Sequence, residues 1–468
     1  MCSFTSHRVI KIDLYNVITK MFPSRYRFLL LLVFSVNLIY GQVIHYRLHE
    51  IPQDYQGEDT TDLYAPFGTS GKVAKAILEG IHFTSKDKSF LIGNTGFWTT
   101  IPEYNFVDGF WLGQTLESSY RFNRKHRLEL EAKLYYTTAR KKFTWETEVS
   151  YFYAPQLVGK LKLHAGNRTA DYDTEEHLAR LENSLYALFL GQTFMKLYLQ
   201  KFVKLQNSFY PVQGLRVHKS LGLHRRQMVD INTQFSFFDS KKNQTNTPNN
   251  LYFKPMPTHL ALIGSLGFDY TLCYSCMRAS QLYNEIIYSY IPTLSARIVF
   301  GIPVGTANRS SFQFVEASIN QRFKFRMRNT FDYKIGGGGF LSKHNLQFPD
   351  FRHFGAYTLP SMRTFADDGF FLIGYYKADT DKHWIKASGN FVSQQFLLTR
   401  FKWLAQNGFN EGLHARYLYT PNLKHYTEWG YALGYKTFAR VGLFVGFNGG
   451  RYESIGATLS LTWLSSVY

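Results

Sequence analysis

The sequence lacks any internal run of about 18 apolar residues, the length that a membrane-spanning helix needs. Charged residues make up only 19% of the 468, and acidic residues are the scarcer sign, with 34 Asp and Glu against 53 Lys and Arg. The missing apolar run excludes a bundle of spanning helices. Any membrane span beyond the N-terminal region would therefore have to be made of strands, and only a closed barrel satisfies their backbone hydrogen bonds in lipid.

Cysteine is rare, and its placement gives little support for a metal site. Cys2 lies in a segment that we expect to be absent from the mature protein. Cys273 and Cys276 form a lone CYSC pair, half of a zinc site, and no Cys or His pair follows at ligand spacing. A disulfide within the pair would need a turn, because residues three apart on a strand point to opposite faces. We expect no metal and no cofactor, and we favour free thiols over a local disulfide.

Signatures of catalysis are also missing. The sequence contains neither a G-x-S-x-G elbow nor an HExxH motif. Its densest acidic patch, RTADYDTEEH at 168–177, lacks the D-x-D-x-D-G pattern of a calcium loop. With 15 His and 34 acidic residues, some Ser, His and acid side chains must lie close together by chance. We expect that the chain is not an enzyme and has no catalytic residues.

The formal net charge is +19, which suggests an anionic partner. Nucleic acid, lipid head groups and lipopolysaccharide phosphates all fit that charge. Lys and Arg are scattered along the chain and do not cluster on one helix, as they would in a nucleic-acid module. We expect membrane lipid and lipopolysaccharide as partners, together with other envelope proteins, and no nucleic acid.

What the sequence does contain is alternation. Aromatic residues make up 18%, with 33 Tyr and 42 Phe, and such residues favour strands. Apolar and polar residues alternate over stretches of about ten residues, which is long for a soluble sheet but suits a tilted membrane strand. The candidates lie at 109–123, 127–136, 143–153, 160–165, 195–209, 213–224, 228–238, 258–271, 294–301, 311–322, 326–338, 369–377, 382–394, 413–419, 428–435, 441–447 and 456–463.

The predicted fold class is all-β, an antiparallel transmembrane β-barrel. An even number of strands is required if both ends of the barrel chain face the periplasm, so the candidates predict about sixteen strands, give or take two. The last candidate, GATLSLTW, places Trp463 where an aromatic girdle would lie. We expect this last strand to close the barrel by pairing with the first, near 109–123.

Two segments interrupt the alternation. EEHLARLENSLYALFLGQTF (175–194) has leucines at helical spacing and predicts a helical insertion. We favour a helix packed on the barrel rim over one that plugs the barrel or lies in the membrane interface. The stretch 342–368 is long and aromatic, and such a loop could fold into the lumen. The glycines of IGGGGF (335–340) allow a bend or a close backbone approach, and they do not form a phosphate loop.

The N-terminus has the layout of a secretory signal peptide. Arg25 and Arg27 precede an apolar stretch from Phe28 to Val36, and Gly41 ends the segment. We therefore predict three parts: an upstream extension with a cleaved signal peptide at 1–41, a short periplasmic lead-in at 42–104, and the barrel at 105–468. An uncleaved signal anchor is the alternative.

Several motifs, taken in order, carry a resemblance to a known family. The chain resembles the outer-membrane barrel family of Gram-negative bacteria called carboxypeptidase-like regulatory domain-containing proteins, whose barrel is a domain of unknown function. It is more distantly similar to the surface-antigen and outer-membrane-assembly barrel superfamily. The matching motifs are NFVDGFWLG (105–113), RKHRLELEAKLYY (124–136), NSLYALFLGQTFMKLYLQKFVKL (183–205), GGGFL followed by FPDFRHF (337–354), LHARYLYTP (413–421), YTEWGYALG (426–434) and RVGLFVGF (440–447).

The resemblance implies a barrel in the bacterial outer membrane with no catalytic residues and no peptidase activity. Family members usually carry an N-terminal regulatory-like β-sandwich, for which 42–104 is too short. The chain therefore resembles a barrel-only member.

The polar faces of the C-terminal strands hold the candidate site residues. Arg416, Glu428 and Arg440 alternate with apolar residues on consecutive strands. Facing the lumen, they could form cross-strand ion pairs. Stabilisation of the wall is the favoured role, and guiding a substrate or anchoring a folded-in loop is the alternative.

The expected function follows by analogy with assembly-type barrels. We expect a monomeric outer-membrane barrel of unknown substrate that acts in envelope biogenesis or transport and catalyses nothing. A passive pore or structural surface protein is the first alternative, and an outer-membrane enzyme is the second. A soluble lipocalin-like or sandwich protein would contradict all three.

Overall fold

The computed structural model describes residues 80–85, 89–94, 103–123, 125–175, 177–212, 214–238, 244–271, 275–280, 283–288, 291–303, 310–325, 329–357, 368–436 and 439–460. The chain divides into two compact units, Met1–His49 and Glu50–Tyr468, and every described residue belongs to the second. The predicted signal peptide and Trp463 lie outside the described residues. So does Cys273, and the side chain of Cys276 is not described either.

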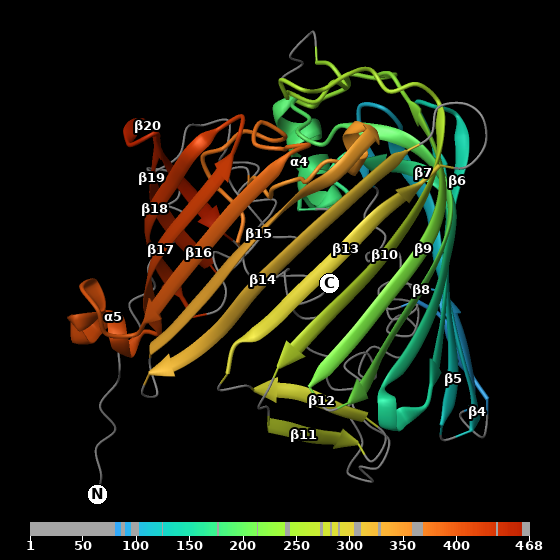
Figure 1. Ribbon diagram of the computed structural model, residues 1–468, viewed down its shortest axis with the longest axis horizontal. Helices are drawn as coiled ribbons and strands as arrows, with labels where there is room; N and C mark the ends of the chain where they lie inside the picture. The colour runs from blue at the N-terminus through green and yellow to red at the C-terminus, as the bar shows by residue number, and fades with distance from the viewer. Residues whose placement is uncertain are drawn as a thin grey trace, which may run out of the picture. The chain divides into compact units, whose positions relative to one another are not determined.

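Strands dominate the described chain and follow one another along the curved wall in Figure 1. Eighteen of them form one sheet, and β11 and β12 form a separate hairpin. The sheet contains β1 (His82–Thr84), β2 (Phe90–Asn94), β3 (Tyr104–Asn105), β4 (Gly109–Asn123), β5 (His126–Thr137), β6 (Lys142–Tyr153), β7 (Gly159–Asp171), β8 (Leu197–Val212), β9 (Leu215–Met228), β10 (His259–Thr271), β13 (Thr293–Ile302), β14 (Ser311–Phe325), β15 (Asn329–Asn345), β16 (His383–Ser393), β17 (Phe409–Thr420), β18 (Lys424–Tyr435), β19 (Ala439–Asn448) and β20 (Arg451–Ser460). The hairpin consists of β11 (Ser275–Ser280) and β12 (Tyr283–Tyr288).

The pairing is antiparallel throughout the wall. From β4 to β20, each strand of the sheet pairs with the next one along the chain. This confirms the predicted fold class, and eighteen strands lie within two of the predicted sixteen. The other edge of β4 pairs with β2 through residues 116–120. Among the described residues no pairing joins β4 or β1 with β20, so the expected partner of the last strand is not observed and the sheet is not closed. Because β1 and β2 join the sheet, it also extends into the stretch predicted as a lead-in.

Two predicted strands are wrong. Residues 228–238 and 369–377 contain alternating aromatic residues, but beyond Met228 neither stretch forms a strand. In the first stretch, the backbone N–H of Phe237 donates to the carbonyl of Leu188 at 2.7 Å, so the segment is held by a helix. In the second, the consecutive residues Phe370 and Phe371 are both buried, whereas neighbours on a strand point to opposite faces. The rings of the first stretch remain about half exposed or more, and those of the second are buried by an irregular segment that covers the sheet, so in neither stretch does the spacing reflect a pleat.

The two faces of the wall differ in polarity. Leu134 and Trp145 lie opposite each other on β5 and β6 and remain 56% and 43% exposed. On the other face, Glu146 of β6 contacts His164 of β7 at 2.6 Å. Apolar side chains that face outward around a polar interior are the pattern of a membrane barrel. In the described part of the chain, no helix is both long and apolar enough to cross a membrane.

Helices occur in the connections between strands. The predicted helical insertion is confirmed as α4 (Arg180–Leu190), which ends at Gly191 in the left-handed conformation (φ 59°). Ser184 of α4 accepts a hydrogen bond from the backbone N–H of Tyr104 in β3, at 2.8 Å. A second helix, α5 (Lys402–Gln406), and the 3₁₀ turns η3 (Pro155–Leu157), η4 (Phe348–Asp350) and η5 (Leu398–Arg400) are shorter.

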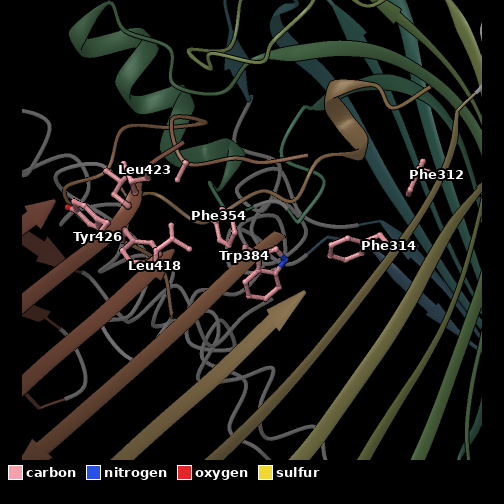
Figure 2. Packing of buried hydrophobic residues seen from close by; sticks show 10 residues of the cluster. Phe312, Phe314, Phe354, Trp384, Leu418, Leu423 and Tyr426 are labelled. Atoms are coloured by element: carbon pink, nitrogen blue, oxygen red, sulfur yellow. The ribbon is translucent and has the colours of Figure 1, made fainter. Parts of the chain in front are cut away.

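The connection between β15 and β16 packs against the inner face of the wall. We call its described residues, 346–357 and 368–382, the inner segment. Figure 2 shows Phe354 of this segment beside Trp384 of β16, with Leu418 and Tyr426 nearby. The rings of Phe354 and Trp384 lie 5.5 Å apart in an edge-to-face arrangement. Of the aromatic stretch predicted at 342–368, residues 342–345 belong to β15, and the described residues 346–357 pack on the inner face, as do residues 368–382.

Candidate functional site

The structure brings together two of the three predicted site residues. Arg416 of β17 and Glu428 of β18 are register partners, and both are buried. Arg440 pairs in register with Gly434, six residues from Glu428 along β18. That separation is about 20 Å along a strand. Arg440 instead donates a hydrogen bond to the side chain of Asn410 at 2.8 Å.

Glu428 holds the inner segment directly. Its carboxylate accepts hydrogen bonds from the backbone N–H groups of Phe371 at 2.9 Å and Leu372 at 2.8 Å. The hydroxyl of Tyr426 donates a third bond at 2.8 Å. Because Glu428 is fully buried, these bonds are shielded from water and are costly to break. We name this contact the Glu428 clasp.

The side chains beside the clasp fit the glycine-rich end of the wall. The ring of Phe371 lies 4.5 Å from that of Phe444 and 4.9 Å from the guanidinium of Arg416. A Cβ placed on Gly446 or Gly456 would lie 3.3 Å or 2.7 Å from the side chain of Leu372. The two glycines therefore leave the space that Leu372 fills.

A cavity of about 350 Å³ lies between another part of the inner segment and the wall. On the side of the sheet, the cavity is bordered by the inner faces of β7 to β10 and β13 to β15. Residues 173–175 and 349–353 form its roof. The strand residues that line it include Arg168, Tyr198, Gln200, Lys204, His224, Arg226 and Arg297.

Ion pairs connect this roof to the wall. Asp350 accepts a hydrogen bond from Arg226 at 2.6 Å, and both side chains are almost fully buried. Glu175 pairs with Arg297 of β13 at 3.2 Å and with Arg352 of the inner segment. Burial alone would raise the pKa of Glu175, but Arg352 and the neighbouring cations outweigh burial and hold the pKa below its usual range.

A fourth anchor lies at the end of β7. The hydroxyl of Tyr376 donates to Asp171 at 2.6 Å and accepts the backbone N–H of Lys196 at 2.8 Å. The inner segment is therefore fixed to β7, β9, β18 and Glu175 by polar contacts that are separate in the sequence.

Sequence reasoning missed the residues that anchor the inner segment. Glu175, Arg352 and Tyr376 lie in irregular segments and Asp350 ends the short turn η4, where no periodicity marks an inward side. The only signals were the dense acidic patch at 168–177 and the charged residues within FPDFR. Among the described residues, no group of three or more His, Cys, Asp or Glu side chains could hold a metal ion.

A buried His–Asp pair closes the inner segment on itself. His353 Nδ1 contacts Asp379 Oδ2 at 2.6 Å, and the side chains are 1% and 2% exposed. Burial lowers the pKa of His353, but Asp379, supported by Asp173 and Asp171, outweighs burial and raises the pKa from 6.5 to about 9. His353 is therefore protonated at neutral pH.

This pair predicts that the inner segment loses stability in alkali. A His whose pKa is raised on folding contributes its full stabilisation below the unfolded pKa of about 6.5 and loses it as the pH rises through about 9. The contribution is at most about 3 kcal/mol. We expect the urea midpoint to fall between pH 7 and pH 10 and to fall less in His353→Gln. An identical pH profile for the two proteins would contradict this assignment.

The solved structures to which this chain is similar include three outer-membrane proteins. BamA from Haemophilus ducreyi lacking POTRA domains 1–3 is 10% identical, with a TM-score of 0.39 over 88% of this chain and 80% of that one. CdiB from Acinetobacter baumannii is 10% identical, with a TM-score of 0.35. The match covers 72% of this chain and 53% of the CdiB chain. Wzi, an outer membrane protein involved in group 1 capsule assembly in Escherichia coli, is 8% identical, with a TM-score of 0.28 over 86% and 88%.

No curated protein matches the chain. Residues 74–433, most of the chain, match the C-terminal domain of a family of unknown function, DUF5686. The chain therefore belongs to the DUF5686 C-terminal domain family.

Proposed function

We propose that this chain is an outer-membrane β-barrel protein of a Gram-negative bacterium that acts in envelope biogenesis or transport, with its interior closed by the inner segment. It catalyses nothing itself, and its partners are lipid, lipopolysaccharide and other envelope proteins. Within DUF5686, we further infer kinship with the carboxypeptidase-like regulatory domain-containing proteins. The substrate is left open.

The Glu428 clasp is the observation that carries this proposal. A passive pore needs a water-filled interior bordered by polar side chains. Here Phe371 and Leu372 fill the inner face beside β18, and their backbone N–H groups are bonded to a buried carboxylate. A pore that is always open does not fit such an interior. A barrel that opens only while it handles a substrate fits it better.

Fractionation tests the location. We expect the protein in the carbonate-washed outer-membrane fraction, and we expect it to migrate more slowly on a gel after boiling, because boiling unfolds a barrel. Recovery as a soluble periplasmic protein would refute the proposal.

A reversible lock tests whether the inner segment must move. Cysteines at Leu372 and Gly456 would be joined by a direct disulfide formed with a mild oxidant, with Cys2, Cys273 and Cys276 replaced by serine. A Cβ at Gly456 would lie 2.7 Å from the Leu372 side chain, so the two positions are close enough for a disulfide. We expect locked cells to lose the outer-membrane barrier, measured as uptake of a large antibiotic, and to regain it after reduction.

The control lock joins two wall strands without touching the inner segment. Leu443 and Ala457 are register partners on β19 and β20, so cysteines there can be linked in the same way. This lock should leave antibiotic uptake unchanged. If both locks act alike, or if neither acts, the proposed function is wrong.

A further inference from the structure

The connection between β16 and β17 exposes a group of large apolar side chains. It runs from residue 394 to residue 408 and contains η5 and α5. We call these residues the outer segment. Its exposed large apolar residues, between 42% and 67% exposed, are Leu397, Leu398, Phe401 and Trp403. A contiguous apolar patch on a protein surface marks an interaction site, so the outer segment needs a partner.

Glu411 shows on which face of the wall the outer segment lies. Along β17, Arg416 points inward, since its guanidinium contacts the ring of Phe371 in the inner segment. β17 pairs with both neighbours without a register shift, so residues an odd number of positions away, such as Glu411, point outward. The buried carboxylate of Glu411 accepts backbone N–H groups from Leu397, at 2.7 Å, and Thr399. The outer segment therefore folds back over the outer face, where it also shields a carboxylate that would be costly to expose to lipid.

Aromatic rings connect the outer segment with the outer face of the strands. The ring of Trp403 lies 6.2 Å from that of Phe409, which lies 5.1 Å from the ring of Tyr435 on β18. On the other side, Phe396 contacts Phe391 of β16 with 5.8 Å between the rings. Aromatic residues at the border of the apolar band of a barrel lie at the membrane–water interface. The patch is therefore continuous with the surface that meets lipid.

The outer segment lies at the end of the wall opposite α4 (Figure 1). Every second connection of an antiparallel sheet lies at the same end, so the segment shares its end with the connections β4–β5, β8–β9 and β14–β15. Only two or three residues separate the strands in each of these, although the β11–β12 hairpin also lies at this end. Membrane barrels have short turns on the periplasmic side, so the outer segment meets the periplasmic leaflet.

The charge of the outer segment indicates which lipid it meets. Arg400 and Lys402 are both exposed, and no acidic residue occurs between residues 394 and 408. Lys436 adds a third exposed cation beside the segment, since its backbone N–H donates to the carbonyl of Gly408 at 2.8 Å. Apolar side chains flanked by basic ones are typical of segments that lie in the surface of a membrane with anionic head groups.

We propose that the outer segment is a membrane-interface anchor that binds anionic phospholipid. The side chains of Leu397, Leu398 and Phe401 enter the boundary of the acyl chains. Arg400 and Lys402 contact the phosphates of the head groups. This inference rests on the proposed location in the membrane, and it names the lipid class that one surface of the chain binds.

Quenching of a fluorescent label by lipid tests whether the outer segment lies in the membrane. The full chain, with its native cysteines replaced by serine, would carry one bimane-labelled cysteine in nanodiscs of phosphatidylcholine brominated on the acyl chains. We expect a label at Phe401→Cys to be quenched about as strongly as one at Leu134→Cys, on the outer face of β5. Gln406→Cys is the matched control. Gln406 lies four residues from Lys402, on the polar side of α5, and a label there should be quenched less.

A second measurement tests the anionic head group. With phosphatidylglycerol as a minor component, bromine would be placed on this lipid or on an equal amount of phosphatidylcholine. A cation near an anionic membrane surface favours the anionic lipid about fivefold, so brominated phosphatidylglycerol should quench the Phe401 label more strongly. The double variant Arg400→Gln with Lys402→Gln should lose this preference. Lys424→Gln with Arg451→Gln, two exposed cations at the opposite end of the wall, should keep it.

The outcomes separate this inference from the proposed function. If the Leu134 label is not quenched, the wall does not face lipid and the proposed location is wrong as well. If the Leu134 label is quenched but the Phe401 label matches the Gln406 label, the inference alone is wrong. Equal quenching by the two brominated lipids would overturn the anionic head group. A Phe401 label that loses its quenching when two copies share a nanodisc would identify a dimer contact and contradict the inference. Retained heat-modifiable migration on gels would show that each variant is folded.

Discussion

Replacement of Glu428 by alanine is expected to turn a nearly closed protein into one that conducts ions across a planar lipid bilayer. The substitution removes the acceptor of three hydrogen bonds, from Phe371 N–H, Leu372 N–H and the Tyr426 hydroxyl. Each buried donor left without a partner costs about 1–3 kcal/mol, so the bound position of the inner segment is strongly disfavoured. Long open periods should replace the rare openings of the unmodified protein.

Glu411→Ala is the matched control for this experiment. Glu411 is also a buried carboxylate on a neighbouring strand, and it accepts backbone N–H groups from Leu397, at 2.7 Å, and Thr399. Those residues lie in the connection between β16 and β17 and not in the inner segment. Glu411→Ala should therefore leave the conductance low. High conductance in the unmodified protein, or equal conductance in the two variants, would contradict the role given to the clasp.

Arg226→Ala is expected to cause a large loss of stability. It leaves Asp350, whose side chain is 1% exposed, as a buried carboxylate without its cation. Breaking one side of a buried pair costs about 3–5 kcal/mol. The hydroxyl of Ser310, at 2.9 Å, is a neutral donor and compensates only in part. The loss should appear as a lower urea midpoint of the protein in detergent.

The exposed pair between Arg322 and Asp332 gives the comparison. The Arg322 side chain is 61% exposed, and Arg322→Ala should cost less than about 1 kcal/mol. Replacing both members of the buried pair, with Arg226→Gln and Asp350→Asn, should recover much of the loss, since neither group is then left charged and alone. An Arg226→Ala midpoint no lower than that of Arg322→Ala would show that the buried pair does not hold the inner segment.

The wall could be predicted from the sequence because the physics of its strands is periodic. A strand between lipid and a polar interior must alternate, so runs such as 127–136 and 143–153 identify both the strand and its outer face. The same reasoning failed at 228–238 and 369–377. The first stretch is held to α4 by a backbone hydrogen bond, and the rings of the second are buried beside β18. The spacing of aromatic residues alone does not distinguish either arrangement from a pleated strand.

The site was only partly accessible to the same reasoning. Arg416 and Glu428 could be identified because their alternation places them on the inner face, and the structure puts them opposite each other. Arg440 satisfies the same alternation, but it pairs with Gly434, six residues from Glu428 along β18. Alternation predicts the face on which a side chain lies and not its register with the next strand. The role of Glu428 depends on residues 371 and 372, which are 56 or more positions away and reach it through an irregular segment.

Hydrogen exchange of the inner segment tests the central claim most directly. The measurement would follow the backbone amides of residues 368–380 by mass spectrometry, with the intact protein in lipid nanodiscs at neutral pH. If Glu428 and the neighbouring anchors hold this segment inside the wall, the amides of Phe371 and Leu372 should exchange as slowly as those of β17 and β18. Exchange of these two amides at the rate of an exposed loop would contradict the claim that the interior is closed.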